Sequence, residues 1–133
     1  MSRQIFVNLP VKDLQRAIDF YTALGFSFNP KYTDENATCM IVADDILVML
    51  LVEPFFQSFI DKPLCDAKAA TEVLLALSCK DRAEVDEMMR KALAAGGTAP
   101  RPPQDLGFMY SHQFEDLDGH IWEPFYMDEE QMP

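Results

Sequence analysis

VNLPVKDLQRAIDFYTALG (residues 7–25) and LLALSCKDRAEVDEMMRKALAAGG (residues 74–97) are two versions of one pattern. In each, a strand-like apolar stretch runs into Lys-Asp, and apolar residues at helical spacing follow. Asp13 and Asp81 are suitable N-caps, and glycine ends each helical pattern, at Gly25 and at Gly96 with Gly97. The sequence therefore predicts a duplicated strand–helix unit.

Three further strands are expected after each helix, bounded by polar turns. The predicted strands of the first module are residues 4–11, 26–32, 37–43 and 46–53, and those of the second are 72–79, 98–103, 108–115 and 121–127. We predict a single α+β domain over residues 1–133, made of two βαβββ modules (1–53 and 72–127), a connector (54–71) and an acidic tail (128–133). The modules are expected to form a curved mixed sheet around a central cavity, with the helices outside.

Composition and charge narrow the classes of partner. The chain has 133 residues, 49% of them hydrophobic, and a net charge of −11. Such an acidic chain is not expected to bind nucleic acid or an anionic membrane surface. Three separated cysteines without a C-x-x-C pair, and no visible signal peptide, favour a reduced, cytoplasmic protein.

Strand alternation predicts which side chains line the cavity. The inward set is Phe6, Asn8, Leu47, Met49, Leu51, Leu74, Ala76, Ser78, Met109, Ser111, Gln113, Ile121, Glu123 and Phe125. This set contains no Arg or Lys, and His112 is expected on the opposite face. Glu123 is the candidate catalytic residue, as a general acid or base, or a partner for a cationic group, with Asn8, Ser111 and Gln113 as hydrogen-bond partners. An inherited structural role for Glu123 is an equal alternative.

Two motifs carry a resemblance to a known family. The order of elements, with VKDLQRAIDFYTALGF (residues 11–26) and FEDLDGHIWEPFYM (residues 114–127), resembles the vicinal-oxygen-chelate superfamily of glyoxalases, bleomycin-resistance proteins and dioxygenases. Within it, the chain is similar to the group of predicted lactoylglutathione lyases. The resemblance covers essentially the whole chain and implies a paired-module fold.

The resemblance also implies four positions that supply metal ligands in the metal-dependent members. Matched motif to motif, these positions fall on Phe6, Met49, Leu74 and Glu123. The first three side chains cannot bind a hard divalent cation at ordinary affinity. We therefore expect no metal cofactor.

Three functions follow as hypotheses. The leading one is metal-free binding of a small, partly hydrophobic organic molecule at Phe6, Asn8, Met49, Leu74, Ser111, Gln113 and Glu123. The second is a lactoylglutathione lyase-like enzyme with Glu123 as general base, and the third is a protein-interaction module on a degenerate fold. We also expect a homodimer, and the aromatic patch of Phe55, Phe56 and Phe59 is predicted to form a short helix that serves as a flap or as dimer packing.

Overall fold

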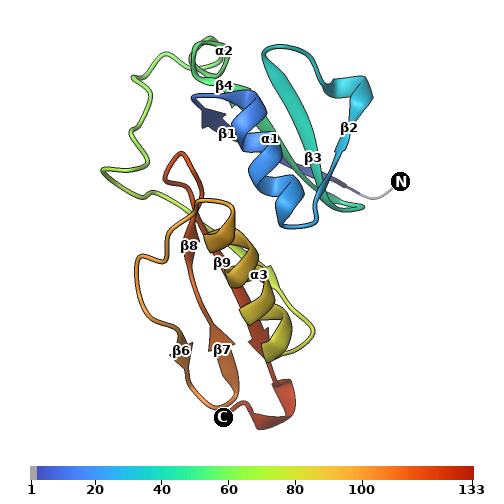
Figure 1. The fold of residues 1–133 in the computed structure, drawn as a ribbon, viewed down its shortest axis with the longest axis vertical. Coiled ribbons are helices and arrows are strands. Elements are labelled where there is room, and N and C mark those ends of the chain that lie inside the picture. Colours follow the sequence, from blue (N-terminus) through green and yellow to red (C-terminus); the bar gives the residue numbers. More distant parts are fainter. Residues whose placement is uncertain (1–2) are drawn as a thin grey trace. The chain divides into compact units, whose positions relative to one another are not determined.

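The structure is a computed structural model that describes residues 3–133, so the first two residues of the predicted module 1–53 lie outside the described range. The chain forms two compact units, residues 1–66 and 67–133. Each unit has one mixed sheet of its own, and the fold class is α+β, as predicted (Figure 1). No helix in the described part of the chain is long and apolar enough to cross a membrane.

The first unit has the predicted βαβββ order. Its elements are β1 (Ile5–Val11), α1 (Leu14–Ala23), β2 (Ser27–Asn29), the 3-10 helix η1 (Pro30–Tyr32), β3 (Ala37–Ala43) and β4 (Ile46–Val52). The strand order is β1-β4-β3-β2, and only the β1–β4 pair of this sheet is parallel. The predicted strand over residues 26–32 ends early because Pro30 begins η1, where it has no N–H for a ladder.

Helix α1 begins and packs as its sequence predicts. The Asp13 carboxylate accepts a hydrogen bond from the Arg16 N–H at 3.1 Å, so it satisfies one of the free donors of the first turn. The apolar stripe of Ala17, Phe20 and Tyr21 is buried. In Figure 1 the helix lies across the first sheet, whose core-facing strand residues include Leu9, Val48 and Leu50.

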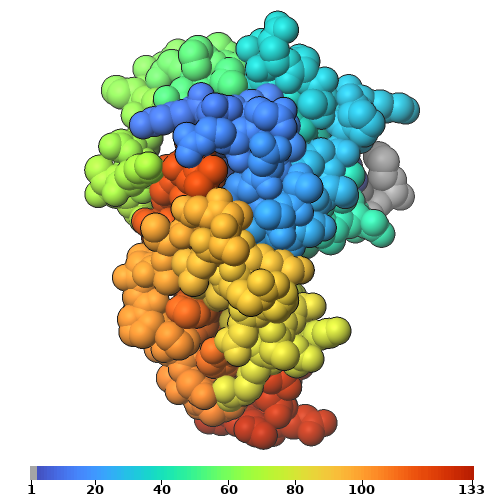
Figure 2. All heavy atoms as spheres, viewed as in Figure 1, coloured from blue at the N-terminus to red at the C-terminus, as the bar shows by residue number. Residues whose placement is uncertain are grey.

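A short helix, α2 (Glu53–Gln57), begins the connector, as predicted for the aromatic patch. The rings of Phe55 and Phe59 contact edge to face, with centroids 5.0 Å apart. Phe59 is nevertheless 67% exposed. Residues 58–63 are exposed throughout, as part of the green surface in Figure 2.

The second unit repeats the strand–helix start and then departs from the first. Its elements are β5 (Leu74–Ser78), α3 (Arg82–Ala94), β6 (Gln104–Asp105), β7 (Met109–Ser111), β8 (Phe114–Glu115), β9 (Ile121–Met127) and the 3-10 helix η2 (Glu129–Gln131). The sheet order is β5-β9-β7-β6, with β8 also paired to β9, and β5 is parallel to β9. The first and last long strands of each unit are therefore parallel neighbours.

Helix α3 covers one face of this second sheet. Asp81 caps the helix by accepting from the Glu84 N–H at 2.8 Å, and the Glu84 carboxylate accepts from the Lys80 N–H. The buried helix residues are Val85, Met89 and Ala92. Phe114 and Trp122, a register pair of β8 and β9, stack at 6.4 Å between ring centroids and are almost fully buried.

The predicted strand over residues 98–103 is wrong. Only Thr98 pairs with the sheet, in an isolated bridge to Glu115, and β6 begins at Gln104. The stretch between contains Pro100, Pro102 and Pro103, which have no N–H to donate to a ladder. The predicted strand over residues 108–115 is likewise split into β7 and β8.

Candidate functional site

One face of the second sheet carries the predicted inward residues of this unit. In the ladder, Ala76 lies beside Glu123, Leu74 beside Ile121, and Ser78 beside Phe125, so these side chains share a face. The opposite face belongs to α3, because Tyr110, which is a register partner of Tyr126, donates its phenol hydrogen to Asp86 of that helix. Strand alternation thus correctly separates the Glu123 face from the helix-covered face.

Glu123 lies in a small polar pocket of the second unit. The Nε2 of Gln113 donates to Oε2 of Glu123 at 2.7 Å, which confirms one predicted hydrogen-bond partner. Ser111 is 4% exposed and lines the same pocket. The pocket volume is about 30 Å³, and its lining is Arg101, Pro102, Gln104, Ser111, His112, Gln113 and Glu123. A volume of that size has room for about two groups the size of a water molecule.

Arg101 is the charged pocket residue that the sequence does not predict, and it corrects the expectation that the residues around Glu123 include no Arg or Lys. It lies in a predicted strand that does not form, and strand alternation cannot place a residue of an irregular segment. The prolines on both sides of Arg101 are the signal that could have shown this. Arg101 is exposed and forms no ion pair within the described residues.

His112 is also among the residues that line the pocket. Its N–H donates to the Pro124 carbonyl at 3.2 Å, which continues the ladder to β9. The residue lies between β7 and β8, where the regular strand is interrupted, and simple alternation is weakest there. The residues that line the pocket are therefore mostly polar or charged.

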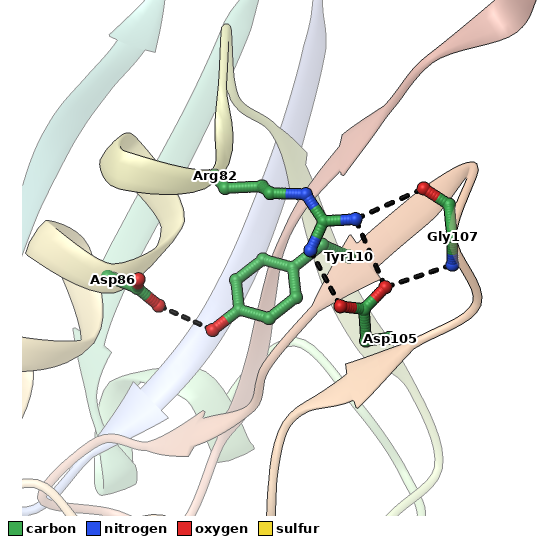
Figure 3. A network of polar contacts seen from close by, with 5 residues as sticks. All are labelled: Arg82, Asp86, Asp105, Gly107 and Tyr110. Atoms are coloured by element: carbon green, nitrogen blue, oxygen red, sulfur yellow. Dashed lines mark hydrogen bonds and ion pairs between the residues drawn. The ribbon is translucent and has the colours of Figure 1, made fainter.

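A polar network holds the hairpin of β6 and β7 beside α3 (Figure 3). The guanidinium of Arg82 donates to both carboxylate oxygens of Asp105, at 2.7 and 3.0 Å, and to the Gly107 carbonyl at 3.1 Å. It also lies 5.0 Å from the centroid of the Tyr110 ring. We call these contacts the Arg82 network. Gln104 pairs with Ser111 in the same hairpin, so the network helps to position these two pocket residues.

Several pKa values in this unit are shifted by named contacts. The hydrogen bonds from Arg82, followed by the one from the Gly107 N–H, lower the pKa of Asp105 to about 2. The bond to Asp86 raises the pKa of Tyr110. Burial, followed by the neighbouring charge of Glu84, raises the pKa of Cys79 to about 11, so this thiol is protonated at neutral pH.

The predicted site residues of the first unit share one face of their own sheet. Phe6 lies beside Leu47 and Asn8 beside Met49 in the β1–β4 ladder. Phe6 is 46% exposed, and the amide of Asn8 donates to the Phe6 carbonyl at 3.2 Å. The expected hydrogen bond between Asn8 and Glu123 stays a prediction.

The residues at the four ligand positions of the metal-dependent relatives do not fit a divalent metal. Phe6 and Leu74 have no donor atom, and Met49 offers only a soft thioether. One carboxylate oxygen of Glu123 already accepts an N–H hydrogen bond. Within either unit, the described residues contain no group of three His, Cys, Asp or Glu side chains placed to hold a metal ion.

Comparison with known proteins gives one family model and several similar solved structures. Residues 3–43 match the family model described as bleomycin resistance protein-like N-terminal. No curated protein sequence matches the chain. Among solved structures, hypothetical protein SA1046 from S. aureus is 30% identical over 95% of both chains, with a TM-score of 0.80.

Two further structures share the fold at lower identity. A glyoxalase-related enzyme from Fulvimarina pelagi is 20% identical over 95% of this chain and 88% of its own, with a TM-score of 0.79. A glyoxalase/bleomycin resistance protein/dioxygenase family enzyme from Burkholderia phytofirmans PsJN is 15% identical over 95% and 99%, with a TM-score of 0.78. The chain is therefore related to SA1046, its residues 3–43 match a bleomycin resistance protein-like model, and its fold is the one shared by proteins of the glyoxalase/bleomycin resistance/dioxygenase type.

Proposed function

We propose that this protein binds a small, partly hydrophobic organic molecule at the Glu123 face of its second sheet. The observation that carries the proposal is the composition of that face. A polar pocket around Glu123 and Gln113 lies on a sheet face that also carries the apolar side chains of Leu74, Ile121 and Phe125. Small-molecule sites combine a few convergent polar groups with apolar walls in this way.

The pocket of the second unit alone is too small for such a molecule. Its volume of about 30 Å³ compares with the hundreds of Å³ of typical ligand sites. We propose that only a polar head group enters it, and that the body of the ligand lies on the apolar side chains of the same sheet face. Leu74, Ile121 and Phe125 supply that surface.

Binding is proposed to need no divalent metal. A metal would polarise a bound oxygen, but three of the four relevant positions hold Phe6, Met49 and Leu74. Orientation of the ligand then depends on hydrogen bonds that Glu123 accepts and that Gln113 and Ser111 donate or accept. Because these groups are pocket-lining and close to one another, they recognise a head group by direct contact.

A thermal-shift screen of small aromatic, cationic and zwitterionic compounds tests the proposal. A ligand at a hundred times its Kd stabilises the folded protein by about 2.7 kcal/mol, which is readily measured as a rise in Tm. The shift should be lost in Glu123→Gln and kept in Glu72→Gln, a matched change at an exposed residue before β5. Binding that ignores Glu123→Gln would contradict the assignment of the site.

A second candidate function is favoured by Arg101. Proton abstraction beside a carbonyl by Glu123 needs a group that stabilises the resulting enolate, and a guanidinium in the same pocket could donate to that oxygen. The corresponding activity is lactoylglutathione lyase-like isomerisation. Turnover of the hemithioacetal of methylglyoxal and glutathione, lost in both Glu123→Gln and Arg101→Gln, would establish it. Absence of turnover with intact ligand binding would leave the binding function.

A further inference from the structure

Two residues of opposite charge, Arg101 and Glu123, line the Glu123 pocket without forming an ion pair with each other. Arg101 and Glu123 both line it, yet no nitrogen of Arg101 lies within 4.0 Å of a Glu123 carboxylate oxygen. Oε2 of Glu123 accepts one hydrogen bond, from Gln113. Its other oxygen and the whole guanidinium of Arg101 remain without a side-chain partner among the described residues.

Arg82, in the same unit, is an arginine whose guanidinium is held by the protein itself. Arg82 donates to two oxygens of Asp105 and to the Gly107 carbonyl, and its charge lies over Tyr110. Three hydrogen bonds from that side chain thus go to groups of the protein. Arg101 has none of these contacts, so its donors are available to a ligand.

The size of the pocket and its border further restrict the ligand. A volume of about 30 Å³ accommodates about two water-sized groups. Ile121 and Phe125 flank Glu123 at two residues on either side along β9, on the same face, and Leu74 lies beside Ile121 and is 51% exposed. The ligand should therefore present two small polar groups of opposite charge and an apolar body.

We propose that the ligand is an α-amino acid with an apolar side chain, a zwitterion whose ammonium and carboxylate groups are adjacent. The ammonium donates to Glu123, the carboxylate accepts from Arg101, and the side chain contacts Ile121 and Phe125. This inference rests on the proposed binding function and specifies its ligand class. Charge-assisted hydrogen bonds on both sides make each charge necessary for affinity.

A ligand series with one charge removed at a time tests the inference by calorimetry. L-phenylalanine carries both charges, its amide only the cation, its N-acetyl derivative only the anion, and the N-acetyl amide neither. L-phenylalanine should bind tightest, and each single-charge compound should bind roughly 10- to 100-fold more weakly, because one charge-assisted hydrogen bond is lost. A neutral compound that binds as well as the zwitterion would overturn the proposal.

Variants assign each charge to its residue. Arg101→Gln should weaken L-phenylalanine by a similar factor while leaving the affinity of the amide within about twofold, since the amide has no carboxylate. Glu123→Gln should also weaken the binding of L-phenylalanine. It should leave the affinity of the N-acetyl derivative within about twofold, since that derivative has no ammonium. Arg16→Gln, at an exposed position of α1, is the matched control and should change neither.

The outcomes separate this inference from the proposed function. If the thermal-shift screen yields a ligand that depends on Glu123 but not on Arg101, the pocket binds small molecules and the zwitterion inference is wrong. If L-phenylalanine binds and Arg101→Gln leaves its affinity unchanged, the role of Arg101 is likewise wrong. If no compound of the screen or the series binds, both proposals fail.

Discussion

Replacing Gly119 by alanine tests how the connector is packed against the turn that precedes β9. Gly119 is buried and has a φ of +92°, where L side chains are strained. A Cβ there would lie 2.7 Å from the Lys68 backbone nitrogen and 2.9 Å from the Ala67 carbonyl carbon. Backbone atoms cannot rotate away as a side chain can, so the turn or the connector must move.

The cost of this substitution can be worked from two contributions. The positive φ costs about 1 kcal/mol, and the forced contact with backbone adds about 1 to 3 kcal/mol. With a urea m-value of about 2 kcal/mol/M, a total loss of about 2 to 4 kcal/mol lowers the unfolding midpoint by about 1 to 2 M. The single tryptophan, Trp122, is buried in the second unit, so its fluorescence reports this unit directly.

Gly107→Ala is the matched control for Gly119→Ala. Gly107 also has a positive φ, +85°, but a Cβ there would meet no atom within 4 Å. Its substitution should cost only the conformational part, about 1 kcal/mol. Equal midpoints for the two variants would refute the close contact between the connector and the turn.

Three other predictions concern charge, thiol chemistry and assembly. The Asp105 carboxyl should titrate near pH 2 by NMR; because its folded pKa lies below its ordinary 3.8, its stabilisation is present above about pH 4 and lost as the pH falls through 2. A midpoint near 3.8 would mean that the Arg82 contact is absent in solution. At pH 8 the exposed Cys65 should react with a thiol reagent before Cys79, because the pKa of Cys79 is raised to about 11. Mass spectrometry identifies the labelled residue, and faster labelling of Cys79 would contradict the burial of that thiol. Light scattering should give twice the chain mass, as expected for a homodimer, and the mass of a single chain would contradict this expectation.

Much of the fold could be predicted from the sequence because local signals agree with one another there. Asp13 and Asp81 both act as N-caps, and the strands over residues 37–43 and 121–127 have the predicted bounds. Alternation also places Glu123 and Gln113 on the same face, and their side chains form a hydrogen bond. In regular segments, the spacing of apolar residues and the helix caps decide the structure.

The remainder could not be predicted because it lies in irregular backbone. Arg101 reaches the pocket from a proline-rich segment that forms no ladder, and alternation says nothing about such a segment. The Arg82 network depends on a contact to Asp105, 23 residues away in the chain, for which the sequence has no periodic signal. The polar character of the pocket was therefore underestimated.

Calorimetric titration of the protein with Zn²⁺, Ni²⁺ and Mn²⁺ tests the central claim, that Glu123 acts in a pocket without a metal centre. With Phe6, Met49 and Leu74 at the other positions, we predict no one-to-one binding at micromolar concentration that depends on Glu123. One equivalent of any of these ions, bound more tightly than about 1 μM in the unmodified protein and lost in Glu123→Gln, would contradict the account.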